Sequence, residues 1–310
     1  MTALICGSVA YDTIMSFDGK FSDALLADQL HKINVSFLVP SMRREFGGCA
    51  GNIAYNLKML GGDPLIMAVI GQDGAPYLER LDTLGISRRC IKTIDSAFTA
   101  QAFITTDGGG NQFTAFHPGA MTYSHQNKVA DAGTVKFAIV APDGRDGMLQ
   151  HASDCVDLNI PFIFDPGQGM PMFSGAELEH FIDLATIVAV NDYEAEMLVE
   201  RTGHSLETLA QRVSALIVTR GELGAEIHTG GQKLDIPSVP VAKVVDPTGC
   251  GDAFRAGVLH GLSTGMDWAT TGRLASLMGA IKIAHQGAQN HSMTRDEVAE
   301  QFKQAFGYSL

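Results

Sequence analysis

The chain has 310 residues, of which 22 are basic and 34 acidic, so its formal net charge is −12. That charge argues against nucleic acid or an anionic membrane surface as a partner. Hydrophobic residues make up 45% of the chain and charged residues 18%, which excludes a disordered chain and favours a large buried core.

The cysteines and the N-terminus indicate the compartment. The five cysteines are odd in number and include no Cys-x-x-Cys pair, so we expect neither a disulfide framework nor a zinc cluster. No secretory leader is visible, and no apolar run reaches the about 18 residues that cross a bilayer. We therefore expect a cytoplasmic protein.

Short apolar runs recur along the chain, and each ends at glycine, alanine, asparagine, aspartate or threonine. They lack polar alternation, which predicts strands buried on both faces. Most are followed by a helical stretch, so we expect a doubly wound, mostly parallel α/β sheet that binds ligands at the carboxyl ends of its strands. The predicted strands are residues 4–6, 65–70, 137–140, 162–164, 187–190 and 216–218.

Two regions depart from this pattern. Residues 31–39 alternate between apolar and polar side chains, and residues 98–106 and 112–117 flank a glycine-rich turn that predicts a hairpin. We interpret both as a small β-sheet lid, built from segments of about 13–46 and 96–120. The lid is inserted into a single α/β domain that spans residues 1–310.

The strongest local signal lies in residues 246–257. Gly249, Cys250 and Gly251 form a turn that leads into an apolar helix, so their backbone N–H groups would make an anion site that needs no lysine. We call these three residues the anion loop. Asp252 follows in the first helical turn, where a carboxylate can simply cap the helix. A cap needs no flanking glycines, however, whereas a closely approaching phosphate does.

A second glycine-rich segment, residues 46–54, also precedes an apolar helix. Taken alone it reads as a packing turn with Asn52 as a cap. The two segments together, in their order and separation, resemble the two signatures of the PfkB/ribokinase-like kinases, and the resemblance extends over the whole chain. Residues 117–121, 165–168 and 191–198 are most similar to those of bacterial adenosine kinases.

The resemblance implies an ATP-dependent phosphotransferase. Asp252 matches the family's general base, a role typically worth ~10²–10⁴ in rate. Gly249, Cys250 and Gly251 match the site that stabilises the transferred phosphate. Cys250 stands where alanine is frequent, but its backbone N–H is retained.

The resemblance also implies the nucleotide and metal sites. The residues matching the ATP site are Asn191, Thr219, Gly221, Gly224 and Gln289. Glu194 matches a residue that holds Mg²⁺ through water, and Asp246 and Thr248 match a site for a monovalent cation such as K⁺. Two alternatives remain open: Asn191 and Glu194 have the spacing of a capping box, and residues 219–224 fit an ordinary turn.

For the acceptor, the resemblance implies that Asp12 accepts hydrogen bonds from the ribose 2′- and 3′-hydroxyls and that Asn52 and Gly48 assist in binding the ribose. The full substrate set is Ser8, Asp12, Gly48, Asn52, Phe116 and Gln168. Hairpin pairing sets Ala102 opposite Phe116 and points Phe103 to the other face. Bacterial adenosine kinases tend to carry an aromatic residue at both paired positions, and here only Phe116 does.

We therefore expect phosphorylation of the adenosine 5′-hydroxyl. One alternative is a sugar kinase of the ribokinase or fructokinase type, and a remote one is a non-catalytic ligand sensor on the same fold. Because an inserted lid exposes edges and an apolar face, we also expect a homodimer through lid residues such as Val35, Phe37 and Phe103.

Overall fold

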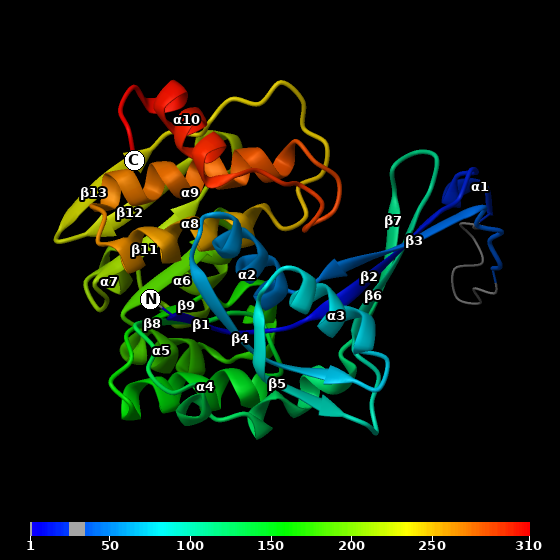
Figure 1. The fold of residues 1–310 in the computed structure, drawn as a ribbon, viewed down its shortest axis with the longest axis horizontal. Coiled ribbons are helices and arrows are strands. Elements are labelled where there is room, and N and C mark those ends of the chain that lie inside the picture. Colours follow the sequence, from blue (N-terminus) through cyan, green and yellow to red (C-terminus); the bar gives the residue numbers. More distant parts are fainter. Residues whose placement is uncertain (1, 25–34) are drawn as a thin grey trace.

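The computed structural model describes residues 2–24 and 35–310. Within them, a large sheet of nine strands has the order β13-β12-β11-β10-β9-β8-β1-β4-β5 (Figure 1). The pairings from β11 to β5 are parallel, and β12 and β13 add an antiparallel hairpin at one edge. The strands are β1 (Thr2–Cys6), β4 (Asp63–Gly71), β5 (Ser87–Ile94), β8 (Phe137–Val140), β9 (Phe162–Phe164), β10 (Ile187–Asn191), β11 (Ala215–Thr219), β12 (Ala225–Thr229) and β13 (Gln232–Ile236). The predicted sheet class and all six predicted strands are confirmed.

Helices cover both faces of this sheet, and the alternation of side chains along β1 separates the two cores. Ile5 packs in one buried cluster, whereas Leu4 and Cys6 pack in the other. The first cluster includes residues of α2 (Cys49–Met59), α3 (Ala75–Thr83), α8 (Cys250–Thr264) and α9 (Trp268–Ile283). The second includes residues of α4 (Arg145–Asp157), α5 (Gly175–Leu184), α6 (Asp192–Thr202) and α7 (Leu206–Ala210). The last helix, α10 (Arg295–Phe306), packs on α9.

The five cysteines are free thiols. None of the helices in the described ranges is both long and apolar enough to cross a bilayer.

A second sheet forms a lid that projects from the body of the molecule, at the right of Figure 1. Its order is β3-β2-β6-β7, and its strands are β2 (Ala10–Ser16), β3 (Ser41–Gly47), β6 (Ala100–Thr106) and β7 (Gln112–His117). The short helix α1 (Phe21–Ala24) lies at its tip. The hairpin register is confirmed, because Ala102 pairs with Phe116.

The prediction of a strand at residues 31–39 is wrong for its described part. Residues 35–39 are not in a strand, and residues 31–34 lie outside the described residues. The lid strands that precede the hairpin are β2 and β3 instead. Four of the seven residues of β3 are exposed, and three of the seven are charged, so the strand carries no apolar alternation that would predict it.

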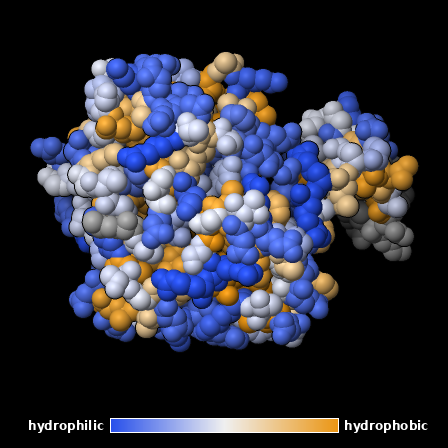
Figure 2. All heavy atoms as spheres, viewed as in Figure 1, coloured by the Kyte–Doolittle hydropathy of each residue, from blue (hydrophilic) through white to orange (hydrophobic). Residues whose placement is uncertain are grey.

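The tip of the lid has a small aromatic core of its own. The ring of Phe37 lies 4.9 Å from that of Phe17 and 5.1 Å from that of Phe21, and Phe113 completes the cluster at 4.6 Å from Phe21. Phe37 is therefore half-buried within its own lid. Apolar side chains are also visible on the surface of the lid, at the right of Figure 2.

Candidate active site

Residues from distant parts of the sequence meet at the carboxyl edge of the large sheet. Asp165 follows β9, and its carboxylate pairs with Arg255 of α8. Asn52 of α2 donates to Asp252 in the first turn of α8. The N-termini of α2 and α8 therefore lie side by side at this edge, which is where ligands bind in open α/β sheets.

Asp252 has the position and ionisation expected of a general base. Its Oδ2 accepts a hydrogen bond of 2.8 Å from Nδ2 of Asn52. Burial raises the pKa of Asp252 to about 6, and the negative charge of Asp165 adds to this, while Asn52 and the Arg255 guanidinium act against it. The carboxylate is therefore mostly ionised at neutral pH, with a pKa close to the working pH of a proton acceptor.

The anion loop adopts the conformation that its glycines permit. Gly249 has a φ of 80°, in the left-handed region, and a Cβ there would lie 2.9 Å from that of Ala288. A Cβ on Gly251 would meet no described atom within 4 Å. The N–H of Cys250 is used inside the loop, where it donates to the carbonyl of Pro247 at 3.1 Å. Since the first turn of a helix leaves its N–H groups without partners, those of Gly251 and Asp252 remain for a ligand.

The second glycine motif joins the lid to α2. Gly48 has a φ of 86°, and a Cβ there would approach the backbone of Ser8 and Ala10 to 2.6 Å. The hydroxyl of Ser8 accepts the N–H of Cys49 at 3.2 Å. The structure thus brings Ser8, Gly48 and Asn52 together, as the sequence predicts.

Asp12 and Phe116 share one face of the lid. Asp12 pairs with Ala102, and Ala102 pairs with Phe116, so the three side chains form a row across neighbouring strands. Burial raises the pKa of Asp12 to about 6, and the negative charges of Glu45 and Asp246 add to this effect. Glu45, which pairs with Asp12, accepts a hydrogen bond from Asn290, and Gly287 in the same segment donates to Asp246, so the face with Asp12 lies near the loop that carries Asp246.

Gln168 lies at the edge of this arrangement. It is exposed, in the 3₁₀ helix Gly167–Met172 that follows Asp165. Among the described residues, no hydrogen bond joins its side chain to another predicted site residue.

Asn191 and Glu194 form the capping box that their spacing allows. The N–H of Glu194 donates to Oδ1 of Asn191 at 2.7 Å, and the N–H of Asn191 donates to Oε2 of Glu194 at 2.8 Å. Burial raises the pKa of Glu194, partly offset by that second bond. The other carboxylate oxygen, Oε1, accepts no hydrogen bond within the described residues, so Glu194 can both cap α6 and bind a metal-bound water.

The loop from Thr219 to Gly224 lies at the carboxyl end of β11. Gly221 has a φ of 54°, and Gly224 has a φ of 87°. A Cβ on Gly224 would overlap the carbonyl oxygen of Ile236 in β13. Gly224 is thus required by packing against the edge hairpin, whether or not a nucleotide binds there.

Asp246, predicted with Thr248 as a site for a monovalent cation, lies beside the buried ammonium group of Lys282. The two carboxylate oxygens of Asp246 accept the N–H groups of Thr248 and Gly287, each at 2.9 Å. Burial opposes ionisation of Asp246, but these N–H groups outweigh it and lower its pKa. Lys282, which is fully buried, places its ammonium 2.6 Å from the Asp246 carbonyl oxygen and 3.1 Å from that of His285.

Gln289, predicted at the ATP site, is buried between α2 and α3. Its Nε2 donates to Oδ1 of Asn52 at 3.0 Å and to the hydroxyl of Tyr77 at 3.1 Å. Sequence reasoning missed the roles of Tyr77, Arg255 and Lys282. A single cation inside an apolar helical run was a usable signal for Arg255 and Lys282, but nothing in the sequence marks Tyr77.

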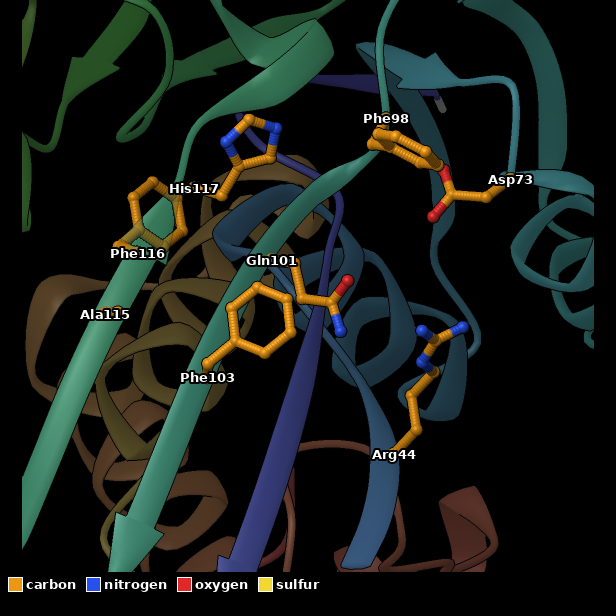
Figure 3. A pocket seen from close by; sticks show the side chains of 8 residues that line it. All are labelled: Arg44, Asp73, Phe98, Gln101, Phe103, Ala115, Phe116 and His117. Atoms are coloured by element: carbon orange, nitrogen blue, oxygen red, sulfur yellow. The ribbon is translucent and has the colours of Figure 1, made fainter. Parts of the chain in front are cut away.

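A separate pocket of about 670 Å³ lies on the lid. Figure 3 shows Gln101 and Phe103 projecting from β6 beside Arg44 of β3 and His117 of β7. Because side chains alternate along a strand, these residues occupy the face opposite Asp12. We call it the outer lid face. The pocket therefore lies mainly on the outer lid face, although Phe116 also lines it.

Comparison with known proteins identifies the class. Residues 12–295 match the model of the pfkB family of carbohydrate kinases. The chain is 30% identical over 272 residues to the nucleoside kinase of Methanocaldococcus jannaschii, covering 87% of this chain and 89% of that protein. The chain therefore belongs to the PfkB family of carbohydrate kinases.

The fold is also similar to that of solved structures. The nucleoside kinase of Burkholderia thailandensis in complex with inosine aligns with a TM-score of 0.90 and 55% identity, over 99% of each chain. The same enzyme in complex with ADP-inosine aligns with a TM-score of 0.88 and 56% identity, over 99% of this chain and 97% of that one.

Proposed function

We propose that the protein is an ATP-dependent nucleoside kinase that phosphorylates the 5′-hydroxyl of purine nucleosides, adenosine among them. The observation that carries this proposal is the Asp252 carboxylate, held by Asn52 beside the free N–H groups that open α8. A base next to an anion site is the arrangement that phosphoryl transfer requires. The inosine complex of the B. thailandensis relative supports a nucleoside acceptor.

In the proposed mechanism, Asp252 accepts the proton of the 5′-hydroxyl as that oxygen attacks the γ-phosphorus of ATP, whose bond to the β,γ-bridging oxygen breaks and releases ADP. The N–H groups of Gly251 and Asp252 stabilise the charge on the transferred phosphoryl group. Asp12 accepts hydrogen bonds from the ribose 2′- and 3′-hydroxyls. Phe116, on the same face of the lid, stacks on the base.

The lid favours a base-bearing acceptor over a free sugar. Ile14 and Ile104 pair with each other and continue the face that carries Asp12, so the middle of the surface beyond the ribose position is apolar, with Arg43 and Thr114 on the flanking strands. A purine can bury area against such a surface, whereas a free sugar would need polar side chains there.

For the cofactors, we propose ATP with Mg²⁺. Glu194 would hold Mg²⁺ through water with its free Oε1, and the ion would neutralise charge on the phosphates. The ATP site would lie along Asn191, Thr219 and the loop to Gly224. Because the Lys282 ammonium already neutralises the Asp246 region, we expect a weak requirement for K⁺ at Asp246 and Thr248.

The test measures ADP release with ATP, Mg²⁺ and either adenosine, inosine, ribose or fructose. We expect the highest kcat/KM with the nucleosides and a loss of about 10² or more in turnover for Asp252→Asn, whose amide should still permit folding. A higher kcat/KM with ribose or fructose would identify a sugar kinase and reject the nucleoside assignment. Binding without ADP release from any acceptor would support the non-catalytic sensor.

A further inference from the structure

A chain of four hydrogen bonds runs from the root of the lid to the catalytic carboxylate. The hydroxyl of Tyr77 donates to the carbonyl of Gly47 at 2.7 Å. Nε2 of Gln289 donates to the Tyr77 hydroxyl at 3.1 Å and to Oδ1 of Asn52 at 3.0 Å. Nδ2 of Asn52 then donates to Oδ2 of Asp252 at 2.8 Å.

The donor in each bond of this chain is determined by chemistry. A backbone carbonyl can only accept, so the single hydroxyl proton of Tyr77 goes to Gly47. The Tyr77 oxygen can then only accept, which turns the amide nitrogen of Gln289 toward it. The second proton on that nitrogen meets Oδ1 of Asn52. The amide nitrogen of Asn52 is thereby left to face Asp252.

The side chains that make these hydrogen bonds are buried. The exposed fraction is 0% for Tyr77, 2% for Gln289 and 5% for Asn52. Gly51 makes the room, because a Cβ there would overlap the Tyr77 hydroxyl and lie 3.1 Å from Nε2 of Gln289. The third glycine of the segment 46–54 is thus explained by a neighbouring side chain and not by a ligand.

We infer that Tyr77 and Gln289 are positioning residues that hold the Asn52 amide so that it donates to Asp252 and stabilises the ionised base. An asparagine free to rotate could also turn its amide oxygen to accept a hydrogen bond from a neutral Asp252 and so stabilise the protonated form. The hydrogen bonds that run from Tyr77 through Gln289 to Asn52, called the relay below, prevent the Asn52 amide from rotating in this way. This inference rests on the proposed function for its kinetic consequence, but not for the ionisation of Asp252 itself.

Other groups that face Asp252 also affect its ionisation, some in the same direction as the Asn52 amide and some in the opposite one. Burial raises its pKa, and the charge of Asp165 after β9 adds to that effect. Arg255, one turn further along α8, lowers it, and the Cys49 thiol of α2 contacts the same carboxylate. None of these groups changes in the variants below, so a shift can be assigned to the amide.

The first test compares pH profiles of kcat for Tyr77→Phe and Gln289→Met with that of the wild type. We expect the acid limb to move up by about one pH unit, since one net hydrogen bond is worth on the order of one pKa unit. Turnover would then fall about twofold at pH 7 and close to tenfold below pH 5.5, with the nucleoside KM little changed.

The matched control is Tyr55→Phe. Its hydroxyl donates to the carbonyl of His291, so this variant also removes a tyrosine bond to the segment after α9 without touching the relay. Its acid limb should stay at the wild-type pH. An unmoved limb in both relay variants, or an equal loss at every pH, would overturn the inference.

A second measurement needs no turnover. In protein labelled with ¹³C at the aspartate carboxyl carbons, the Asp252 signal is the one that Asp252→Asn removes. Its titration midpoint should rise by the same amount in Tyr77→Phe and Gln289→Met, and an unchanged midpoint would overturn the inference. If the wild type phosphorylates no acceptor, the proposed function fails, but this titration still tests the relay.

Discussion

Arg255 and Asp165 form a buried ion pair across 90 residues of sequence. Nε and one terminal nitrogen of the guanidinium donate to the two carboxylate oxygens, each at 3.2 Å. The side chains are 5% and 7% exposed. Arg255 lies one helical turn after Asp252 in α8, so the ion pair joins α8 to the end of β9.

Removing one partner should leave an uncompensated buried charge. We expect Arg255→Met to lower the free energy of unfolding by about 3–5 kcal/mol, measured by urea titration. Arg212→Met, which breaks an exposed pair with Asp183, should cost less than about 1 kcal/mol. If both variants lose the same stability, burial of the first pair is not what matters.

The pH dependence of activity should reflect two carboxylates. The pKa values of Asp12 and Asp252 are both raised to about 6, so each loses its charge as the pH falls through that value. On the acid side, log kcat/KM should approach a slope of two, because both groups titrate in the free enzyme. Log kcat should approach a slope of one, because bound ribose keeps Asp12 ionised. An acid limb near pH 4 would contradict this assignment.

Phe116→Ala should raise the KM for adenosine about two- to tenfold at unchanged kcat, since an aromatic stack is worth ~0.5–1.5 kcal/mol. Steady-state kinetics checks this directly. Phe103→Ala is the matched control, because Phe103 projects from the outer lid face, and it should leave KM unchanged. Equal effects of the two variants would place the base elsewhere.

The outer lid face should join two copies of the chain. Its pocket offers Phe103 together with Arg44 and Asp73, and we expect a two-fold contact there to pair Arg44 of one copy with Asp73 of the other. We expect sedimentation velocity at micromolar concentration to give a dimer, and Phe103→Asp to give a monomer. Phe116→Ala should remain dimeric. A monomeric wild type would reject this interface.

Lys282→Met should open a site for a monovalent cation. The carbonyls of Asp246 and His285 would lose their buried donor, at a cost of about 1–3 kcal/mol in stability. We expect KCl, but not choline chloride, to raise the Tm of this variant. The wild type and the exposed control Lys303→Met should respond equally to both salts. No difference between the salts in Lys282→Met would contradict the prediction.

The two sheets differ in how well their sequences predict them. Strands such as β4 and β8 are buried on both faces, so hydrophobicity alone marks them. Among the lid strands, β3 and β7 are largely exposed, and β3 carries Arg43, Arg44 and Glu45, so its pattern resembles a loop. Only the glycine-rich turn at residues 107–111 revealed the hairpin.

The residues of the candidate active site also differ in how well the sequence predicts them. Glycine motifs predict where α2 and α8 begin, but the contact between Asn52 and Asp252 is seen only in the structure. Tyr77 and Lys282 are single residues in helices, and the contacts of Tyr77 with Gly47 and of Lys282 with Asp246 span 30 or more residues of sequence. No local pattern encodes such contacts, because they depend on how the helices pack across the sheet.

The pairing of Phe116 with Ala102 has a consequence for the range of acceptors. In the proposed complex, a ring stands at only one of the two positions, so one face of the base would meet an aromatic plane and the other would not. The ribose would still be held between Asp12 and Asp252. Discrimination would lie with the sugar, and the identity of the base would be weakly enforced.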